Sequence, residues 1–118
     1  SLRVIDPSTH SETILYDPGQ STDDETLQPF WSPDGREVYY STFRCGVSKI
    51  NYSSGKRTCL KSKCDNDEYF DITVSASSQK ILCSKQHDRA PDWYNQYMSN
   101  KLVLMNLDGS NEQEINLP

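Results

Sequence analysis

Residues 28–41 read Gln-Pro-Phe-Trp-Ser-Pro-Asp-Gly-Arg-Glu-Val-Tyr-Tyr-Ser, and this stretch decides the fold. Pro33 presets φ for a tight turn, and Gly35 tolerates a positive φ in the same turn. Short runs rich in aromatic and β-branched residues flank the turn on both sides, and such runs favour strands. The stretch therefore predicts a β-hairpin.

Related hairpins recur along the chain. Residues 31–41 lie over residues 74–84 with apolar positions in register, although the turn changes from Pro-Asp-Gly to Ala-Ser-Ser. A second unit lies at residues 4–15 and again, 45 residues later, at residues 49–60; its pattern returns in residues 104–115. No stretch shows the sustained i, i+3, i+4, i+7 spacing of a helix. The sequence therefore predicts an all-β chain.

The two units alternate with a period near 45 residues, which is the period of four-stranded antiparallel propeller blades. A β-sandwich is the alternative, but it would not require internal self-similarity. We expect residues 2–16 to form the outer two strands of one blade and residues 28–62 a complete blade. Residues 69–117 are expected to form another blade, with an inserted loop at residues 85–100. These are about two and a half blades of an incomplete propeller, because closed propellers typically have about four to eight.

Residues 28–41 resemble the TolB-type, WD-like propeller repeat, in which a Pro and an aromatic precede Ser-Pro-Asp-Gly and an apolar strand. Residues 104–111 are similar to the turn between that family's third and fourth strands, whereas residues 75–78 depart from its pattern. The resemblance covers most of the chain. It implies a propeller, a core position for Trp31 on an innermost strand and, by analogy of fold, periplasmic or cell-envelope work.

The amino-acid composition limits the classes of partner that the chain is expected to bind. The 118 residues include 17 acidic and 12 basic side chains, a net charge of −5, which argues against nucleic acid or an anionic membrane face. The apolar runs are far shorter than the roughly 20 residues of a membrane span. The chain has no initiator Met and begins like a strand, so we expect it to be processed or excised. The remaining blades are then expected from the same longer chain or from other copies.

Three features are expected on one rim of the blades. These are equivalent acidic links at residues 22–25 and 65–68 and the inserted loop, whose aromatic residues are of the types enriched at contact surfaces. The residues predicted to bind a protein or peptide partner are Asp23, Asp24, Glu25, Asp67, Glu68, Trp93, Tyr94 and Tyr97. Neither link has the loop geometry of a calcium site, and no metal or cofactor is expected.

Catalytic signatures are absent from the sequence. It has no G-x-S-x-G elbow, no H-E-x-x-H motif and no glycine-rich phosphate loop, and His87, the one acid-base candidate, has no nucleophile beside it. We therefore expect a non-catalytic interaction scaffold. One alternative is the propeller of a larger hydrolase or lyase. Another is a self-assembling subunit whose open blade is completed by a neighbouring copy.

The four cysteines are Cys45, Cys59, Cys64 and Cys83, and they fit no paired zinc pattern. Their even number favours disulfides and an oxidising compartment, either periplasmic or extracellular. A hairpin centred on residues 53–54 would bring Cys45 and Cys64 near one open end, which favours that pair and leaves Cys59 for Cys83. Three connectivities remain open.

Overall fold

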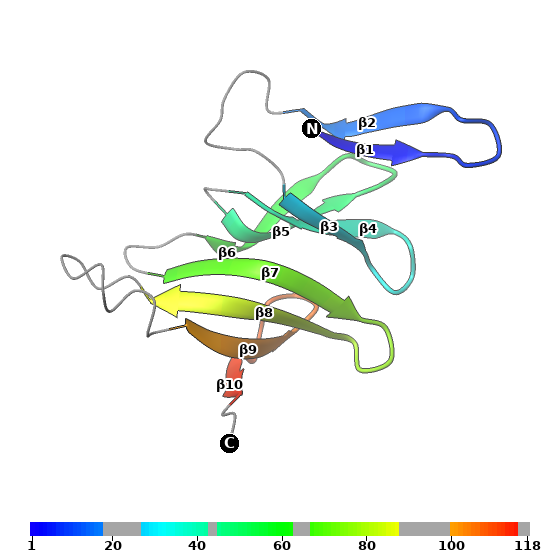
Figure 1. Ribbon diagram of the computed structural model, residues 1–118. Helices are drawn as coiled ribbons and strands as arrows, with labels where there is room; N and C mark the ends of the chain where they lie inside the picture. Colours follow the sequence, from blue (N-terminus) through cyan, green and yellow to red (C-terminus); the bar gives the residue numbers. More distant parts are fainter. Residues whose placement is uncertain (18–26, 43–44, 63–66, 88–99, 116–118) are drawn as a thin grey trace.

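The computed structural model shown in Figure 1 describes residues 1–17, 27–42, 45–62, 67–87 and 100–115. No helix occurs in these ranges, so the all-β prediction is confirmed for them. The strands are β1 (Leu2–Ile5), β2 (Glu12–Tyr16), β3 (Leu27–Trp31), β4 (Glu37–Ser41), β5 (Cys45–Asn51), β6 (Arg57–Ser62), β7 (Asp67–Ser75), β8 (Lys80–His87), β9 (Asn100–Asn106) and β10 (Gln113–Ile115).

Within the described ranges the strands form three antiparallel sheets. The hairpin sheet consists of β1 and β2, the middle sheet has the order β3-β4-β5-β6, and the terminal sheet has the order β7-β8-β9-β10. Figure 1 shows them stacked face to face, with the hairpin sheet at the top and the terminal sheet at the bottom. Sequential four-stranded sheets stacked in this way are the arrangement of propeller blades, and the hairpin sheet has half the strands of a blade.

The middle sheet is buried on both faces, because successive side chains of a strand point to opposite sides. On one face, Val38 and Tyr40 of β4 and Ile50 of β5 form a core with Leu2 of the hairpin sheet. Tyr16 of β2 adds to this interface, since the guanidinium of Arg57 lies 4.0 Å from the centre of its ring. The hairpin sheet is therefore held by apolar burial and by a cation–π contact.

The opposite face of the middle sheet packs on the terminal sheet. Tyr39 of β4 and Val47 of β5 form a second core there, and the Tyr39 hydroxyl donates a hydrogen bond of 2.9 Å to the carbonyl oxygen of Leu107. The terminal sheet contributes the buried side chains Tyr69, Ile72, Ile81, Cys83, Val103 and Met105. This interface is the larger of the two cores.

Gly46 allows the middle and terminal sheets to approach closely. The register of β5 against β6 shifts between Cys45 and Val47, which marks an irregularity at Gly46. A Cβ atom at position 46 would lie 2.6 Å from Cβ of Tyr69 and 3.0 Å from its backbone nitrogen. The backbone of β7 cannot move aside as a flexible side chain can, so only glycine fits here.

We expect Gly46→Ala to lower the free energy of unfolding by about 1 to 3 kcal/mol, as overpacking of a well-packed core does. Urea unfolding followed by circular dichroism measures the change. Gly35→Ala is the control for backbone conformation alone, because Gly35 has φ +73° and nothing within 4 Å of a Cβ atom there. A Gly46→Ala protein as stable as wild type would show that the sheets do not approach in this way.

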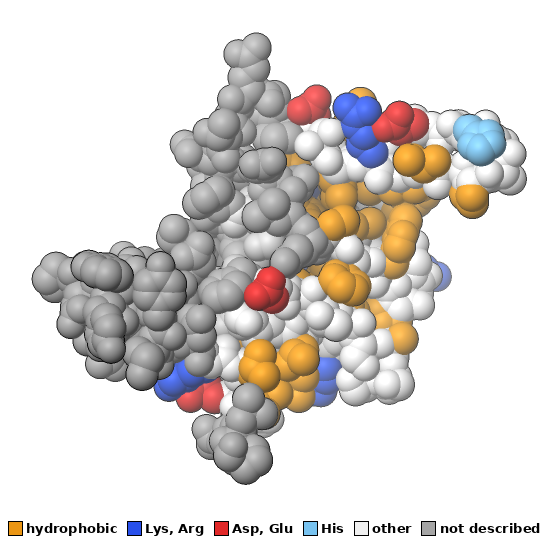
Figure 2. Space-filling model, viewed as in Figure 1, with side chains coloured by type: hydrophobic (Ala, Val, Ile, Leu, Met, Phe, Trp, Pro, Cys, Tyr) orange, Lys and Arg blue, Asp and Glu red, His pale blue; other side chains and the backbone are white. Residues whose placement is uncertain are grey.

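Trp31 is predicted to be a core residue, and this prediction is wrong for the described chain, because its side chain is 48% exposed. Trp31 pairs with Val38 across the ladder, so it shares the face that looks toward the hairpin sheet. Within the described residues that sheet has two strands, and it covers Val38, Tyr40 and Ile50 instead. A groove of about 190 Å³ lies between β1 and β3, and Figure 2 shows hydrophobic side chains gathered there.

Candidate functional site

The strand ends define one rim of the molecule. Because consecutive strands are antiparallel, β3, β5, β7 and β9 begin at the end where β2, β4, β6 and β8 finish. This end is the left side of Figure 1. The predicted partner residues Asp23, Asp24, Glu25, Trp93, Tyr94 and Tyr97 lie outside the described residues, and so does Cys64. The strand ends that flank these segments are thus brought to a common rim.

Two of the predicted partner residues belong to a strand. Asp67 and Glu68 open β7, where they pair with His87 and Gln86 of β8. Two of the four residues of the expected acidic link at residues 65–68 therefore belong to the ladder between β7 and β8. For the same reason the expected insertion at residues 85–100 is too long: β8 runs to His87, and β9 begins at Asn100.

The opposite end carries compact polar turns. Oδ1 of Asn51 accepts hydrogen bonds of 2.9 Å from the backbone nitrogens of Ser53 and Ser54. Asp34 accepts a hydrogen bond of 2.6 Å from the Ser32 hydroxyl, and this bond lowers the pKa of the Asp34 carboxyl. Gly35 has a φ of +73° in the same turn. These residues act in turns, as is typical of Asn, Asp and Gly.

A half-buried ion cluster joins the middle and terminal sheets. Oε2 of Glu112 accepts a hydrogen bond of 2.8 Å from Nζ of Lys85, and Oε1 accepts one of 2.6 Å from the Tyr69 hydroxyl. Nζ of Lys61, on β6, lies 3.4 Å from Oε1 of Glu112. The carboxylate of Glu112 therefore sits between two ammonium groups that come from different sheets. We refer to Lys61, Tyr69, Lys85 and Glu112 as the ion cluster.

The cluster fixes the charge of Glu112. Burial by itself raises the pKa of this carboxyl, but hydrogen bonds from Lys85 and Tyr69 and the nearby ammonium charges outweigh it and lower the pKa. Cys83 lies close by, where burial, with a smaller effect from Glu112, raises the pKa of its thiol to about 12. A thiol with so high a pKa stays protonated at neutral pH, so Cys83 is a poor nucleophile.

The ion cluster predicts an acid-dependent loss of stability. The pKa of Glu112 is lower in the folded chain than its ordinary value of 4.5. The ionised carboxylate therefore contributes its full share to the free energy of unfolding above pH 4.5, and this share is lost as the pH falls through the folded pKa. Glutamine does not titrate, so the free energy of unfolding of Glu112→Gln is expected to fall less than that of wild type when the pH is lowered from neutral to below 4.5. Glu114→Gln is the control, since Glu114 forms an exposed pair with Lys101 at 3.2 Å. Equal pH profiles for wild type and Glu112→Gln would contradict the prediction.

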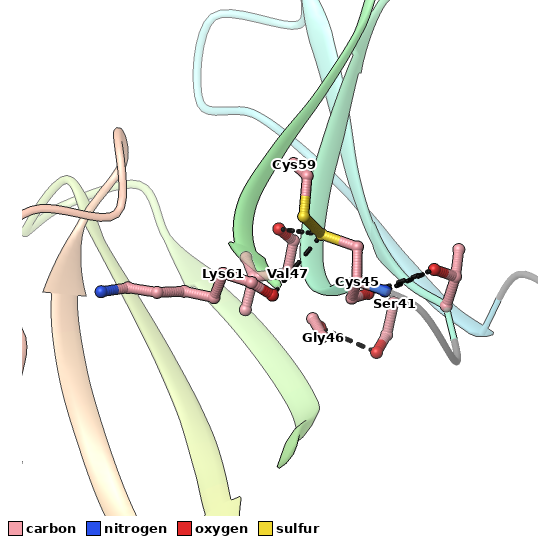
Figure 3. Close-up of a disulfide and its surroundings, with 7 residues drawn as sticks. Ser41, Cys45, Gly46, Val47, Cys59 and Lys61 are labelled. Atoms are coloured by element: carbon pink, nitrogen blue, oxygen red, sulfur yellow. Dashed lines mark hydrogen bonds between the residues drawn. A yellow bond between two sulfur atoms is a disulfide. The ribbon is translucent and has the colours of Figure 1, made fainter. Parts of the chain in front are cut away.

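A disulfide joins Cys45 and Cys59 across β5 and β6 (Figure 3), with a Cα–Cα distance of 5.9 Å. The favoured pairing of Cys45 with Cys64 is therefore wrong. Its premise was a regular hairpin, but the register shifts on both sides of Val47, and the ladder then places Ser62 opposite Cys45. Cys83 is a buried free thiol, so the pairing of Cys59 with Cys83 is also wrong.

Comparison with known proteins supports the fold. No protein-family model matches the sequence, and no curated protein matches it significantly. A solved structure described as a TolB from Agrobacterium tumefaciens superposes with a TM-score of 0.73 at 18% identity, over 95% of this chain and 39% of that one. An oligogalacturonate lyase from Vibrio parahaemolyticus gives a TM-score of 0.71 at 12% identity, over 97% of this chain. An oligogalacturonate lyase in complex with manganese gives 0.72 at 16% identity, also over 97%.

The chain thus has the fold of part of a β-propeller. It spans 39% of the length of the TolB structure and 32% of each lyase structure. The described residues contain no helix of the length and apolarity needed to cross a membrane. These similarities establish the architecture of the chain. The function of the chain has to be argued from the chain's own surfaces.

Proposed function

We propose that the chain is a non-catalytic β-propeller scaffold, built from TolB-type repeats, that binds a protein or peptide on its rim. The observation that carries this proposal is the convergence of strand ends at one end of the stacked sheets. β3 begins there after the acidic residues 22–25, and β8 and β9 meet there on either side of residues 88–99. A rigid scaffold that presents long connections at one edge is where binding residues tend to lie.

The chemistry of these segments favours a basic partner with apolar side chains. Asp23, Asp24 and Glu25 supply negative charge, and Trp93 and Tyr97 supply amphipathic rings of the kind that dominate binding energies. The partner's positive charges then set the association rate, and its apolar groups set the affinity.

An extracytoplasmic location follows from the same proposal. The Cys45–Cys59 disulfide requires an oxidising compartment to persist, and periplasmic or extracellular space provides one. The likeness of the fold to a TolB structure is consistent with this location.

Binding to a library of short peptides that combine Lys or Arg with apolar residues tests the rim. We expect Trp93→Ala with Tyr97→Ala to weaken the selected peptides by about tenfold or more, the range of interface hot spots. The double variant Asp23→Asn, Asp24→Asn should bind the same peptides more weakly than wild type, with the largest difference in affinity at low salt. Asp6→Asn is the control, because Asp6 lies in a turn at the opposite end, where it accepts a hydrogen bond from Ser8. Unchanged affinity in both rim variants would overturn the proposal.

A second candidate is an accessory propeller segment of a larger hydrolase or lyase. It is favoured by the two oligogalacturonate lyases among the similar structures. Here the segment would orient a substrate, and the chemistry would lie elsewhere in the polypeptide. Binding of oligogalacturonate to this chain, with no binding of basic peptides, would favour this candidate over the scaffold.

A further inference from the structure

The turn between β5 and β6 begins with the sequence Asn51-Tyr52-Ser53. This is the Asn-x-Ser pattern, with x other than Pro, to which an oligosaccharide is attached in secreted proteins. No other asparagine of the sequence has Ser or Thr two positions later. β5 begins at the rim and ends at Asn51, so the turn lies at the end of the molecule opposite the rim (Figure 1).

The turn is on the surface of the folded chain. The side chain of Tyr52 is 43% exposed, and Ser53, Ser54 and Gly55 are exposed as well. An attached oligosaccharide is bulky and hydrated, so a folded protein can carry one only where the acceptor segment is open to solvent. This turn meets that condition.

The side-chain amide of Asn51 is held by its oxygen alone. Oδ1 accepts the hydrogen bonds from the backbone nitrogens of Ser53 and Ser54 that are described above. Because the amide group is planar, Nδ2 is directed away from these two donors, and within the described residues it makes no hydrogen bond. These bonds are local, so the turn can form without the neighbouring sheets. The nitrogen that would carry a sugar is therefore oriented and unoccupied.

The repeats supply two comparisons for this amide. Asn106 occupies the equivalent position before the turn from β9 to β10, but its Nδ2 donates a hydrogen bond of 3.1 Å to the Ser110 hydroxyl. Its Oδ1 accepts a hydrogen bond from Nζ of Lys80. The third equivalent, Asp6, is a carboxylate and is followed by a proline. Of the three positions, Asn51 alone combines the acceptor sequence with an unengaged amide nitrogen.

We propose that Asn51 is the acceptor of an N-linked oligosaccharide, transferred by an oligosaccharyltransferase from a polyprenyl diphosphate donor. Nδ2 attacks C1 of the first sugar, and the new C–N bond forms as the bond from C1 to the diphosphate oxygen breaks. The polyprenyl diphosphate leaves, and the amide proton passes to a base of the transferase. No oxidant or reductant takes part.

The disulfide is an independent observation that fits the same compartment. Cys45 and Cys59 link the two strands that flank the turn, and disulfides form and persist in oxidising spaces, which include the lumen of the endoplasmic reticulum. The inference uses the extracytoplasmic location of the proposed function, and it favours the extracellular alternative over the periplasmic one. The oligosaccharide would stand at the end opposite the rim and leave the rim open to its partner.

Secretion of the chain from cultured animal cells, behind an added signal peptide, tests the proposal. The secreted chain is treated with the amidase that releases N-linked oligosaccharides, in water enriched in oxygen-18. The intact mass is expected to fall by that of one oligosaccharide, and peptide mapping is expected to find the isotope in an aspartate formed at position 51. Cell-free translation with microsomes gives the same readout for a variant that is not secreted.

Two variants at Ser53 are matched to each other. Ser53→Ala keeps the backbone nitrogen that donates to Asn51 and removes an exposed hydroxyl that makes no hydrogen bond within the described residues. It is expected to lose the oligosaccharide, as Asn51→Gln is, whereas Ser53→Thr is expected to retain it. Circular dichroism establishes that the variants are folded.

Asp6→Asn is a control for the acceptor sequence, because it places an asparagine in the equivalent turn with a proline next to it. It should add no second oligosaccharide. A wild-type chain without oligosaccharide would overturn the proposal, and so would an oligosaccharide that persists in Ser53→Ala. These outcomes are read from mass and not from peptide affinity, so they are independent of whether the rim binds a partner.

Discussion

Ile50→Ala is expected to lower the free energy of unfolding by about 2 to 5 kcal/mol, the range for truncating a fully buried aliphatic side chain. Ile50 lies between the hairpin and middle sheets with 0% exposure, in contact with the core of Leu2, Val38 and Tyr40. Its truncation leaves a cavity between two sheets, and neither sheet can close onto the gap without moving a hydrogen-bonded ladder. Urea unfolding monitored by circular dichroism gives the value.

The repeats provide a matched control for this substitution. Ile5 occupies the equivalent position of the preceding repeat but is 62% exposed. Ile5→Ala should change the stability by less than about 0.5 kcal/mol, as surface substitutions usually do. Equal losses for the two variants would mean that the hairpin sheet does not pack on the middle sheet as described.

Loss of the Cys45–Cys59 disulfide is the second large effect. The bond closes a loop with a sequence separation of 14, and a cross-link of this span stabilises a fold by about 2 to 4 kcal/mol. We expect the Cys45→Ala, Cys59→Ala protein to be less stable than wild type by this amount in urea. Reducing agent should destabilise wild type and leave the double variant unchanged.

Peptide mapping without reduction checks the pairing independently. Cys45 and Cys59 should appear as one linked pair, and Cys83 should react with alkylating agents only after unfolding, because it is buried. Rapid alkylation of Cys45 in the folded chain would contradict the structure and would remove the main support for an extracytoplasmic location.

The hairpins and their order could be predicted from sequence because local chemistry determines them. Pro33 and Gly35 specify a turn, and Gly35 does adopt a positive φ of +73° in it. The alternation of apolar residues then fixes which side chains face the neighbouring sheets. The other hairpins could be found by aligning the sequence with itself, because they repeat the pattern of the first hairpin.

The errors have a common physical origin in features that depend on long-range contacts. Trp31 occupies a core position in its repeat, but its burial depends on strands of a neighbouring sheet. The Cys45–Cys59 pairing depends on register shifts around Val47 that no turn motif announces. The ion cluster escaped prediction because Lys61, Lys85 and Glu112 are distant in sequence and meet only when two sheets stack.

The rim shows the same division between local and distant information. Sequence period correctly indicated that the links between sheets leave from one edge, because alternate connections of antiparallel strands must do so. It overestimated the length of those links at Asp67 and at His87, where the ladder of β7 and β8 extends further than the turn residues suggest.

Burial of the middle sheet on both faces makes its unfolding different from that of its neighbours. Opening the hairpin sheet or the terminal sheet disrupts one interface, whereas opening the middle sheet disrupts two. The chain then behaves as a linear array of coupled units, in which fluctuations begin at the ends and the centre opens last. Native-state amide exchange would therefore be slowest in β4 and β5, the pair of strands that is expected to open last.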